Sequence, residues 1–227
     1  MVETGTVDKE GLVLWAREQT AGRGRSGRTW VSAPGNLYVS IILSAPESAA
    51  IAPQIGFVAA LSVIGAIQAV APDRGSDGLL ACKWPNDVLL AGGKVAGLLA
   101  ETCTSPEGQN WVIVGIGVNI NPVTVAEARY PLASLAEHGM AVGAPRLLEA
   151  LLHDFYGRLE RWRRDGFEPV RFEWVSRAAR LGQDLTVATV SGELRGTFAG
   201  LDVDGAMLLK LAGGSGQQRV LAGDVLR

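Results

Sequence analysis

The sequence predicts an α+β protein, and three features indicate this class. Large apolar residues recur at every second position over residues 36–44 and 111–119, which is typical of strands with one buried face. Residues 53–71 form a long apolar stretch bounded by Pro53 and Pro72, which predicts a buried helix. From Gly182 onward, short alternating segments and tight turns predict a small β-structure that follows the α+β part.

Turn residues and periodicity predict the other elements. The predicted strands cover residues 12–16, 79–90 with an interruption at Trp84-Pro85, and 94–102 after a Gly92-Gly93 turn. The predicted helices cover residues 145–166 and 168–181. Between the last long strand and these helices, residues 121–140 form an irregular segment (here called the cover segment), and loops of this length are often functional. Trp111, Trp162 and Trp174 are predicted to be core or interface residues.

These boundaries predict two domains. Residues 1–181 would form the larger one, and residues 182–227 a small β-barrel with a hairpin at Asp204-Gly205. The chain has 227 residues, of which 48% are hydrophobic and 19% charged, and this composition is typical of a compact enzyme rather than a disordered chain.

Charge and cysteine content exclude several classes. The net charge of −2 argues against a general binder of nucleic acids or membrane surfaces. With two histidines, the chain is poorly supplied for a His-based zinc site or a Ser-His-Asp triad. Cys82 and Cys103 show no metal-binding spacing, and the N-terminus has no signal pattern, so we expect a reduced, cytoplasmic protein.

The strand over residues 111–119 has two different faces. Val112, Val114, Ile116 and Val118 form one face of β-branched residues that we expect to pack on helices; Ile113, Gly115, Gly117 and Asn119 form the other. Two glycines on one face leave a flat floor, over which either a ligand or a closely packed neighbour must lie.

A cluster of arginines and glycines gives the strongest signal for an anion. Residues 19–30 (the Arg-Gly loop) place Arg23, Arg25 and Arg28 within six positions, separated by glycines. Glycine lets a backbone approach a ligand closely, and the arginine fork suits phosphate or carboxylate. The alternative is a solvated surface loop.

A second cluster combines Lys83, Asn86 and Asp87 around Trp84-Pro85, with Lys94 following closely. A buried lysine without a partner is unfavourable, so either an anionic ligand or Asp87 should face these lysines. Asp87 is also suited to Mg²⁺ or to a ribose hydroxyl, and surface charges at a strand end are the simpler alternative. Glu101 is either functional or a plain edge charge.

In order, these motifs resemble those of the bacterial biotin protein ligases, from about Leu12 to the C-terminus. The motifs are Gly22-Arg-Gly-Arg-Ser-Gly-Arg-Thr-Trp30, Gly35-Asn-Leu-Tyr-Val-Ser40, Lys83-Trp-Pro-Asn-Asp87, Lys94-Val-Ala-Gly-Leu-Leu-Ala-Glu101 and Gly115-Ile-Gly-Val-Asn-Ile-Asn121. The resemblance implies a catalytic domain like that of class II aminoacyl-tRNA synthetases, with a mixed, largely antiparallel sheet, followed by an SH3-like barrel.

The resemblance also implies an activity. Biotin would react with ATP, with Mg²⁺ as cofactor, to give biotinyl-5′-AMP, and the biotinyl group would pass to a lysine of a biotin carboxyl carrier protein. The implied catalytic residues are Lys94, Arg25 and Lys83. The implied biotin and adenylate contacts are Gln19, Arg23, Gly24, Arg25, Arg28, Trp30, Tyr38, Lys94, Gly97, Gly115 and Gly117. The ATP side would comprise Lys83, Asn86, Asp87 (as a Mg²⁺ ligand) and Asn119, with residues 121–131 of the cover segment over adenine.

The chain departs from the family pattern in two ways. It has no room before Leu12 for the DNA-binding domain of some members, so a repressor role and nucleic-acid binding are not expected. The Ser-Thr-Asn-type segment that usually precedes the Arg-Gly loop is also missing, and residues 3–6 are no convincing substitute. One alternative is a lipoate–protein ligase, which shares the implied catalytic fold and the adenylation chemistry. The other, suggested by the short N-terminus, is a truncated, non-catalytic binding module. A monomer or weak homodimer is expected.

Overall fold

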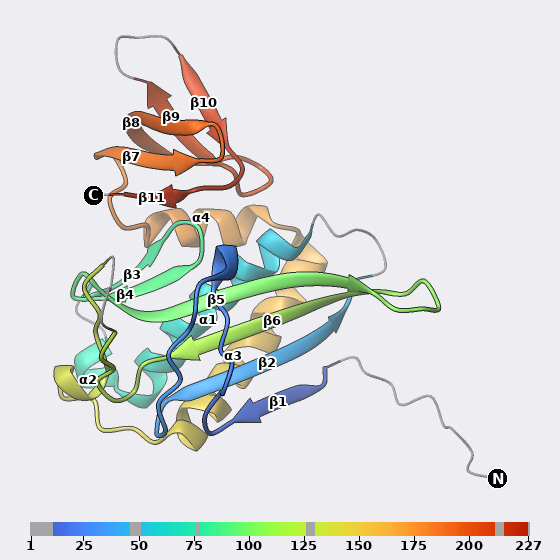
Figure 1. Ribbon diagram of the computed structural model, residues 1–227, viewed down its shortest axis with the longest axis vertical. Coiled ribbons are helices and arrows are strands. Elements are labelled where there is room, and N and C mark those ends of the chain that lie inside the picture. Colours follow the sequence, from blue (N-terminus) through green and yellow to red (C-terminus); the bar gives the residue numbers. More distant parts are fainter. Residues whose placement is uncertain (1–10, 46–50, 76–77, 126–129, 212–215, 227) are drawn as a thin grey trace.

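The computed structural model describes residues 11–45, 51–75, 78–125, 130–211 and 216–226 (Figure 1). The expectation about residues 3–6, and part of the cover segment, lie outside these ranges.

A six-stranded antiparallel sheet forms the centre of the larger part of the molecule. Its strands are β1 (Val13–Ala16), β2 (Leu37–Ser44), β3 (Leu80–Lys83), β4 (Asp87–Leu90), β5 (Gly93–Thr104) and β6 (Asn110–Val118). The spatial order is β1-β2-β6-β5-β4-β3. The prediction of a mixed sheet is corrected here, because every pairing between these described strands is antiparallel.

Two long helices cover one face of this sheet (Figure 1). They are α1 (Ala52–Val70) and α3 (Ala144–Asp165), with the short α2 (Pro72–Gly75) following α1. In α3, the buried residues Leu147, Leu151, Phe155 and Leu159 recur every fourth position and so form one stripe toward α1. Pro145 lies in the first turn, and Gly166 ends the helix with φ +76°, a conformation that glycine adopts without strain.

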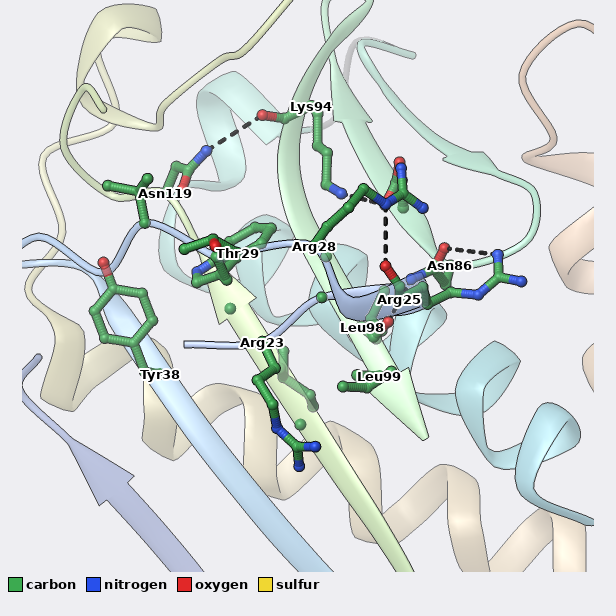
Figure 2. A pocket seen from close by; sticks show the side chains of 18 of the residues that line it. Arg23, Arg25, Arg28, Thr29, Tyr38, Asn86, Lys94, Leu98, Leu99 and Asn119 are labelled. Atoms are coloured by element: carbon green, nitrogen blue, oxygen red, sulfur yellow. Dashed lines mark hydrogen bonds and ion pairs between the residues drawn. The ribbon is translucent and has the colours of Figure 1, made fainter. Parts of the chain in front are cut away.

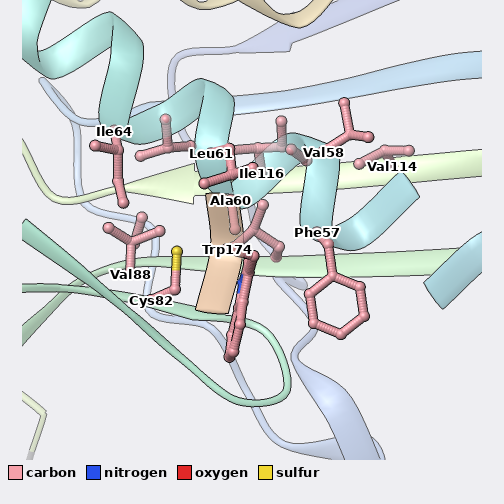
Figure 3. Packing of buried hydrophobic residues seen from close by; sticks show 14 of the residues in the cluster. Phe57, Val58, Ala60, Leu61, Ile64, Cys82, Val88, Val114, Ile116 and Trp174 are labelled. Carbon is pink, nitrogen blue, oxygen red and sulfur yellow. The ribbon is translucent and has the colours of Figure 1, made fainter. Parts of the chain in front are cut away.

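α1 is apolar around most of its circumference because it lies between the sheet and α3. Figure 3 shows Val58, Leu61 and Ile64 of α1 packed toward Val114 and Ile116 of β6. By length and composition alone α1 could cross a membrane, but most of it is buried inside the fold, as in the core helix of a globular protein. The core also encloses Cys82, whose pKa burial raises to about 12, so this thiol is unreactive.

The C-terminal part is a second antiparallel sheet. Its strands are β7 (Asp184–Thr189), β8 (Gly192–Leu201), β9 (Met207–Leu211), β10 (Gln217–Val220) and β11 (Asp224–Val225), in the order β10-β9-β8-β7-β11. The β-structure expected after Gly182 is therefore confirmed as a small antiparallel sheet, and its closure into a barrel remains a prediction.

The second sheet packs on the first part through α4 (Glu168–Ser176) and the hairpin at Asp204-Gly205. Trp84 Nε1 donates a hydrogen bond to Gly205 O at 3.3 Å, and a Cβ on Gly205 would lie 2.5 Å from Phe57 Cε2. Glycine is thus needed for this close approach. One hydrophobic cluster runs from the large sheet into β7, β8 and β9.

The element predictions were mostly confirmed, with two corrections. Residues 79–90 form the hairpin β3–β4 rather than one interrupted strand, because the chain reverses at Trp84-Pro85. The helix predicted over 168–181 ends at Ser176, since residues 177–179 instead hydrogen-bond to Cys82 of β3. Trp111 and Trp174 are buried, and Trp162 is partly buried with its Nε1 donating to Gln54 Oε1 at 3.0 Å.

Candidate active site

A cavity of about 660 Å³ lies on the sheet face opposite α1, a size typical of small-molecule sites. The Arg-Gly loop, strands β2 to β6, the cover segment and strand β11 all contribute to its wall. The cavity therefore forms where segments far apart in the sequence meet.

The structure brings all of the residues predicted for the site to this one cavity. They are Gln19, Arg23, Gly24, Arg25, Arg28, Trp30, Tyr38, Lys83, Asn86, Asp87, Lys94, Gly97, Gly115, Gly117 and Asn119. Glu101 also lines it and pairs with Arg23 at the exposed rim, at 3.1 Å. The individual role of each residue toward a ligand stays a prediction.

The floor of the cavity is made of glycines, and Trp30 covers it. Gly97 of β5 and Gly117 of β6 are paired across the sheet. A Cβ on Gly97 would lie 2.7 Å from Trp30 Cζ3, and one on Gly117 would lie 2.6 Å from Trp30 Cε2. The space predicted for biotin's rings thus holds the Trp30 indole, and only glycine leaves room for it. Trp30 Nε1 is buried without a hydrogen-bond partner among the described residues.

Lys94 lies beside this floor at the beginning of β5, and its backbone is fixed on both sides. Its N–H donates to Pro131 O at 2.8 Å, and its carbonyl accepts from Ala133 N at 3.0 Å. The buried Asn119 side chain donates to Lys94 O at 3.3 Å and to Ala133 O at 3.2 Å (Figure 2). Asn119, predicted to meet the nucleotide, therefore holds the backbone around Lys94.

The Lys94 ammonium forms an ion pair inside the cavity. Its Nζ lies 2.5 Å from Asp87 Oδ1 and 5.2 Å from the centroid of the Trp30 ring. The ammonium therefore already engages this carboxylate oxygen, and the second lone pair of the oxygen can accept a hydrogen bond or bind a cation. One carboxylate between two lysines leaves net positive charge at this wall.

Lys83, at the end of β3, is the second lysine of this wall. Its Nζ lies 3.2 Å from the centroid of the Tyr130 ring. Burial lowers the pKa of Lys83 to about 8, an effect that Asp87 opposes and Lys94 reinforces. The ammonium is therefore partly desolvated, which strengthens its attraction for an anion.

The Arg-Gly loop folds back over the cavity (Figure 2). Arg28 Nε donates to Arg25 O at 3.0 Å, and Arg25 Nη1 donates to Asn86 Oδ1 at 3.5 Å. Ser26 adopts φ +56°, which is unusual for a residue other than glycine, and Gly27 follows with φ +72°. The loop thus reaches its tight conformation and connects the arginines to the Lys83–Asp87 turn.

Tyr38 and Gln19 already have partners within the protein. Tyr38 is buried beside Gly117, its OH donates to Ala33 O at 2.8 Å, and burial raises the pKa of its phenol. Gln19 Oε1 accepts from Ser32 Oγ at 2.9 Å. Both therefore help to shape the wall between the loop and β2.

Sequence reasoning did not single out several residues of the wall; among them are Asp224 and Val225, while Tyr130 was included only as part of the cover segment. Arg28 Nη2 pairs with Asp224 Oδ1 at 2.9 Å, and Arg25 Nη1 donates to Gly223 O at 3.4 Å. Tyr130 lies in the cover segment, which was expected to be functional. The C-terminal residues belong to no motif, so nothing in their sequence pointed to the site.

Comparisons with known proteins identify the family to which the chain belongs. The biotin/lipoate A/B protein ligase family matches residues 6–121. The chain belongs to this family. Among family relatives, it is 42% identical to the biotin–[acetyl-CoA-carboxylase] ligase of Paracoccus denitrificans over 219 residues, which cover 92% of this chain and 88% of that protein. It is 30% identical to a bifunctional ligase/repressor of Bacillus subtilis, and the match covers 95% of this chain and 66% of that protein.

The fold agrees with that of a family member of known structure. The biotin protein ligase from Aquifex aeolicus in complex with biotin and ATP superposes with a TM-score of 0.81 at 29% identity, covering 95% of this chain and 88% of that one. The similarity therefore extends through the C-terminal sheet as well as the motif-bearing part.

Proposed function

We propose that this protein is a biotin protein ligase, which activates biotin with ATP to biotinyl-5′-AMP and transfers the biotinyl group to a lysine of a carrier protein. The observation that carries the proposal is the meeting of five cationic side chains around one glycine-floored cavity, in a chain 42% identical to a biotin ligase. The five are Arg23, at the rim, and Arg25, Arg28, Lys83 and Lys94.

In the first step, a carboxylate oxygen of biotin attacks the α-phosphorus of ATP. An O–P bond forms, the bond from the α-phosphorus to the bridging oxygen breaks, and pyrophosphate leaves. Two anions must approach each other, so positive charge aimed at the reacting atoms lowers the barrier. The two lysines and three arginines that line the cavity are the groups that we assign to this role.

Lys94 is the residue we assign to the reacting atoms, binding the biotin carboxylate and the α-phosphate. Its ammonium already faces a carboxylate, that of Asp87, and its backbone is held by Pro131, Ala133 and Asn119. A fixed ammonium loses little freedom when a substrate carboxylate arrives, which favours a productive geometry.

The glycine floor and Trp30 are assigned to the apolar part of biotin. Since the indole lies against Gly97 and Gly117, the rings of biotin must either stack on it or displace it. A closed Arg-Gly loop would also protect the adenylate from water. Gln19, Arg23, Gly24, Tyr38 and Gly115 are assigned to the surrounding wall.

Asp87 is the residue we assign to Mg²⁺. The part of the chain that the structure describes holds no group of three or more His, Cys, Asp or Glu side chains arranged for a metal. Magnesium, however, is commonly bound by one or two carboxylates together with substrate phosphates, and Asp87 Oδ1 retains an acceptor site. When bound, Mg²⁺ would neutralise charge on the polyphosphate.

In the second step, a lysine amine of the carrier protein attacks the acyl carbon of the adenylate. A C–N bond forms, AMP leaves, and the amine loses a proton. We propose a biotin carboxyl carrier protein as acceptor, on the basis of the named substrate of the Paracoccus relative.

Several finer features are also proposals. We propose that residues 182–227 form a separate barrel of the SH3 type, for which the small antiparallel sheet in the order β10-β9-β8-β7-β11 would supply the strands. A reducing, cytoplasmic location is supported by two free cysteines. We propose a monomer or weak homodimer that does not bind nucleic acid, which is consistent with the net charge of −2.

The test is biotin-dependent exchange of labelled pyrophosphate into ATP by this 227-residue chain with Mg²⁺. Lipoate serves as the control acid, because the family name includes lipoate ligases. Exchange with biotin alone supports the proposal, and exchange with lipoate alone would replace biotin by lipoate. A folded protein that exchanges with neither acid would be a non-catalytic module.

A further inference from the structure

Tyr130 connects the ATP side of the cavity to the C-terminal sheet. One face of its ring lies 3.2 Å from Lys83 Nζ, measured to the ring centroid. Its hydroxyl donates a hydrogen bond to Val225 O at 2.6 Å. Val225 is buried and paired with Val187 of β7, so the carbonyl that holds Tyr130 belongs to ordered β-structure.

The residues directly after Tyr130 are fixed to β5 at Lys94. Pro131 O accepts from Lys94 N, and Ala133 N donates to Lys94 O. Asn119 adds a hydrogen bond to Ala133 O at 3.2 Å. A four-residue segment therefore touches both lysines that are assigned to ATP chemistry: Lys94 through the backbone and Lys83 through the Tyr130 ring.

The Tyr130 ring is a partner for the half-buried ammonium of Lys83. A half-buried ammonium is destabilised unless a partner faces it, and an aromatic face is such a partner. The charged groups around Lys83 are Asp87 of β4, Lys94 of β5, Asp224 of β11 and Arg180 beyond α4. Both carboxylates are already engaged by other cations, Asp87 by Lys94 and Asp224 by Arg28.

We propose that Tyr130 is a positioning residue for Lys83 in adenylation. Its ring holds the ammonium at the cavity wall, and its hydrogen bond to Val225 fixes the ring on the C-terminal sheet. The lysine has four rotatable side-chain bonds, so this contact reduces the freedom it must lose when polyphosphate binds. The inference rests on the proposed function, because it assigns Lys83 to ATP.

Two substitutions separate the two contacts of Tyr130. Tyr130→Leu removes the aromatic face, and Tyr130→Phe keeps the face but removes the hydroxyl. The matched control is Tyr156→Phe, because Tyr156 OH donates to Gly11 O at 3.1 Å, a bond of the same kind outside the cavity wall. Pyrophosphate exchange then gives the KM for ATP, the KM for biotin and kcat for each variant.

We expect Tyr130→Leu to raise the KM for ATP about tenfold, as for loss of a partly desolvated cation–π contact, and to leave the KM for biotin unchanged. Tyr130→Phe should raise the KM for ATP about threefold, as for loss of one hydrogen bond. Tyr156→Phe should change neither. A thermal melt of each variant reports folding, and if the leucine variant does not fold, the phenylalanine variant decides the outcome.

A ligand-free measurement tests the contact itself. The chain has four lysines, so lysine labelled with ¹³C at the ε carbon gives four signals, and Lys83→Arg identifies that of Lys83. The aromatic ring should shift the ε protons of Lys83 upfield in the parent, in Tyr130→Phe and in Tyr156→Phe, but not in Tyr130→Leu.

The inference is overturned if Tyr130→Leu shifts both KM values equally, or behaves as Tyr156→Phe does, while the parent exchanges normally. If the parent itself shows no biotin-dependent exchange although the ring shift is present, the proposed function fails and the assignment of Lys83 to ATP fails with it. The two failures are distinguished by the activity of the parent.

Discussion

The two faces of strand β6 have different surroundings, although successive side chains alternate between them. One face, from Val112 to Val118, is buried under α1 and belongs to the core. The other presents Gly115, Gly117 and the neighbouring Asn119 to the cavity. Successive side chains of a strand point to opposite faces, so one face of β6 can stabilise the fold while the other contributes to ligand binding.

The largest expected effect lies on the cavity face. Lys94→Ala should lower the rate of pyrophosphate exchange about 10²–10³-fold, the loss found when one preorganised electrostatic contact to a transition state is removed. Because Asp87 loses its ion-pair partner, the melting temperature should also fall, so the rate is compared per folded molecule. Lys210→Ala, on β9 outside the cavity wall, is the matched control. Equal exchange rates in both variants would remove Lys94 from the reaction.

A substitution on the core face of β6 should lower stability and leave activity unchanged. Val114→Ala removes two buried methyl groups and should lower the free energy of unfolding by about 2 kcal/mol. Exchange activity per folded molecule should not change, because the Val114 side chain faces α1. Chemical denaturation measures the first quantity and exchange kinetics the second. A Val114→Ala enzyme that is stable but inactive would contradict the separation of the faces.

A larger side chain on the glycine floor tests whether the cavity face of β6 contacts biotin. Gly117→Val places atoms where the Trp30 indole lies, and such overpacking costs about 1–3 kcal/mol. We expect biotin binding to weaken by about tenfold, measured by calorimetry, with Gly157→Val as the matched control, because a Cβ at Gly157 in α3 meets no atom within 4 Å and Gly157 lies outside the cavity wall. Unchanged biotin affinity in Gly117→Val would mean that biotin does not use this floor.

The smallest expected effect concerns pH. The pKa of Lys83 is lowered to about 8 from 10.5, so its positive charge is present below pH 8 and is lost as the pH rises through that value. A bound polyphosphate favours the charged form. The KM for ATP should therefore rise severalfold between pH 7 and pH 9, and ATP binding should take up protons in that range.

The KM for biotin should remain constant over the same interval. Lys83→Arg, whose guanidinium stays charged throughout, should remove the pH dependence. If the dependence persists in this variant, another group is responsible for it.

Much of the fold could be predicted because local patterns agreed with it. The alternation in β2 and β6 and the apolar stripe of α3 each specify one buried face, and proline and glycine mark where the helices begin and end. The errors fell where tertiary contacts override local preference. Residues 177–179 leave the helical pattern to bond with Cys82, and Trp84-Pro85 reverses the chain with its indole bonded to Gly205.

Some features of the candidate site could likewise be predicted from local sequence, and others could not. Arginines, lysines and glycines in short motifs can be recognised from the sequence, since unusual residue types at close spacing need a ligand or a partner to explain them. The sequence alone was therefore enough to predict most of the strands, the two long helices and a site for anionic ligands. Only the tertiary structure decided that Trp30 lies on the glycine floor, that Asn119 serves the backbone of Lys94, and that Tyr130 and Asp224 complete the wall. These contacts join residues that are far apart along the chain. Local sequence patterns do not show which distant residues come together when the chain folds.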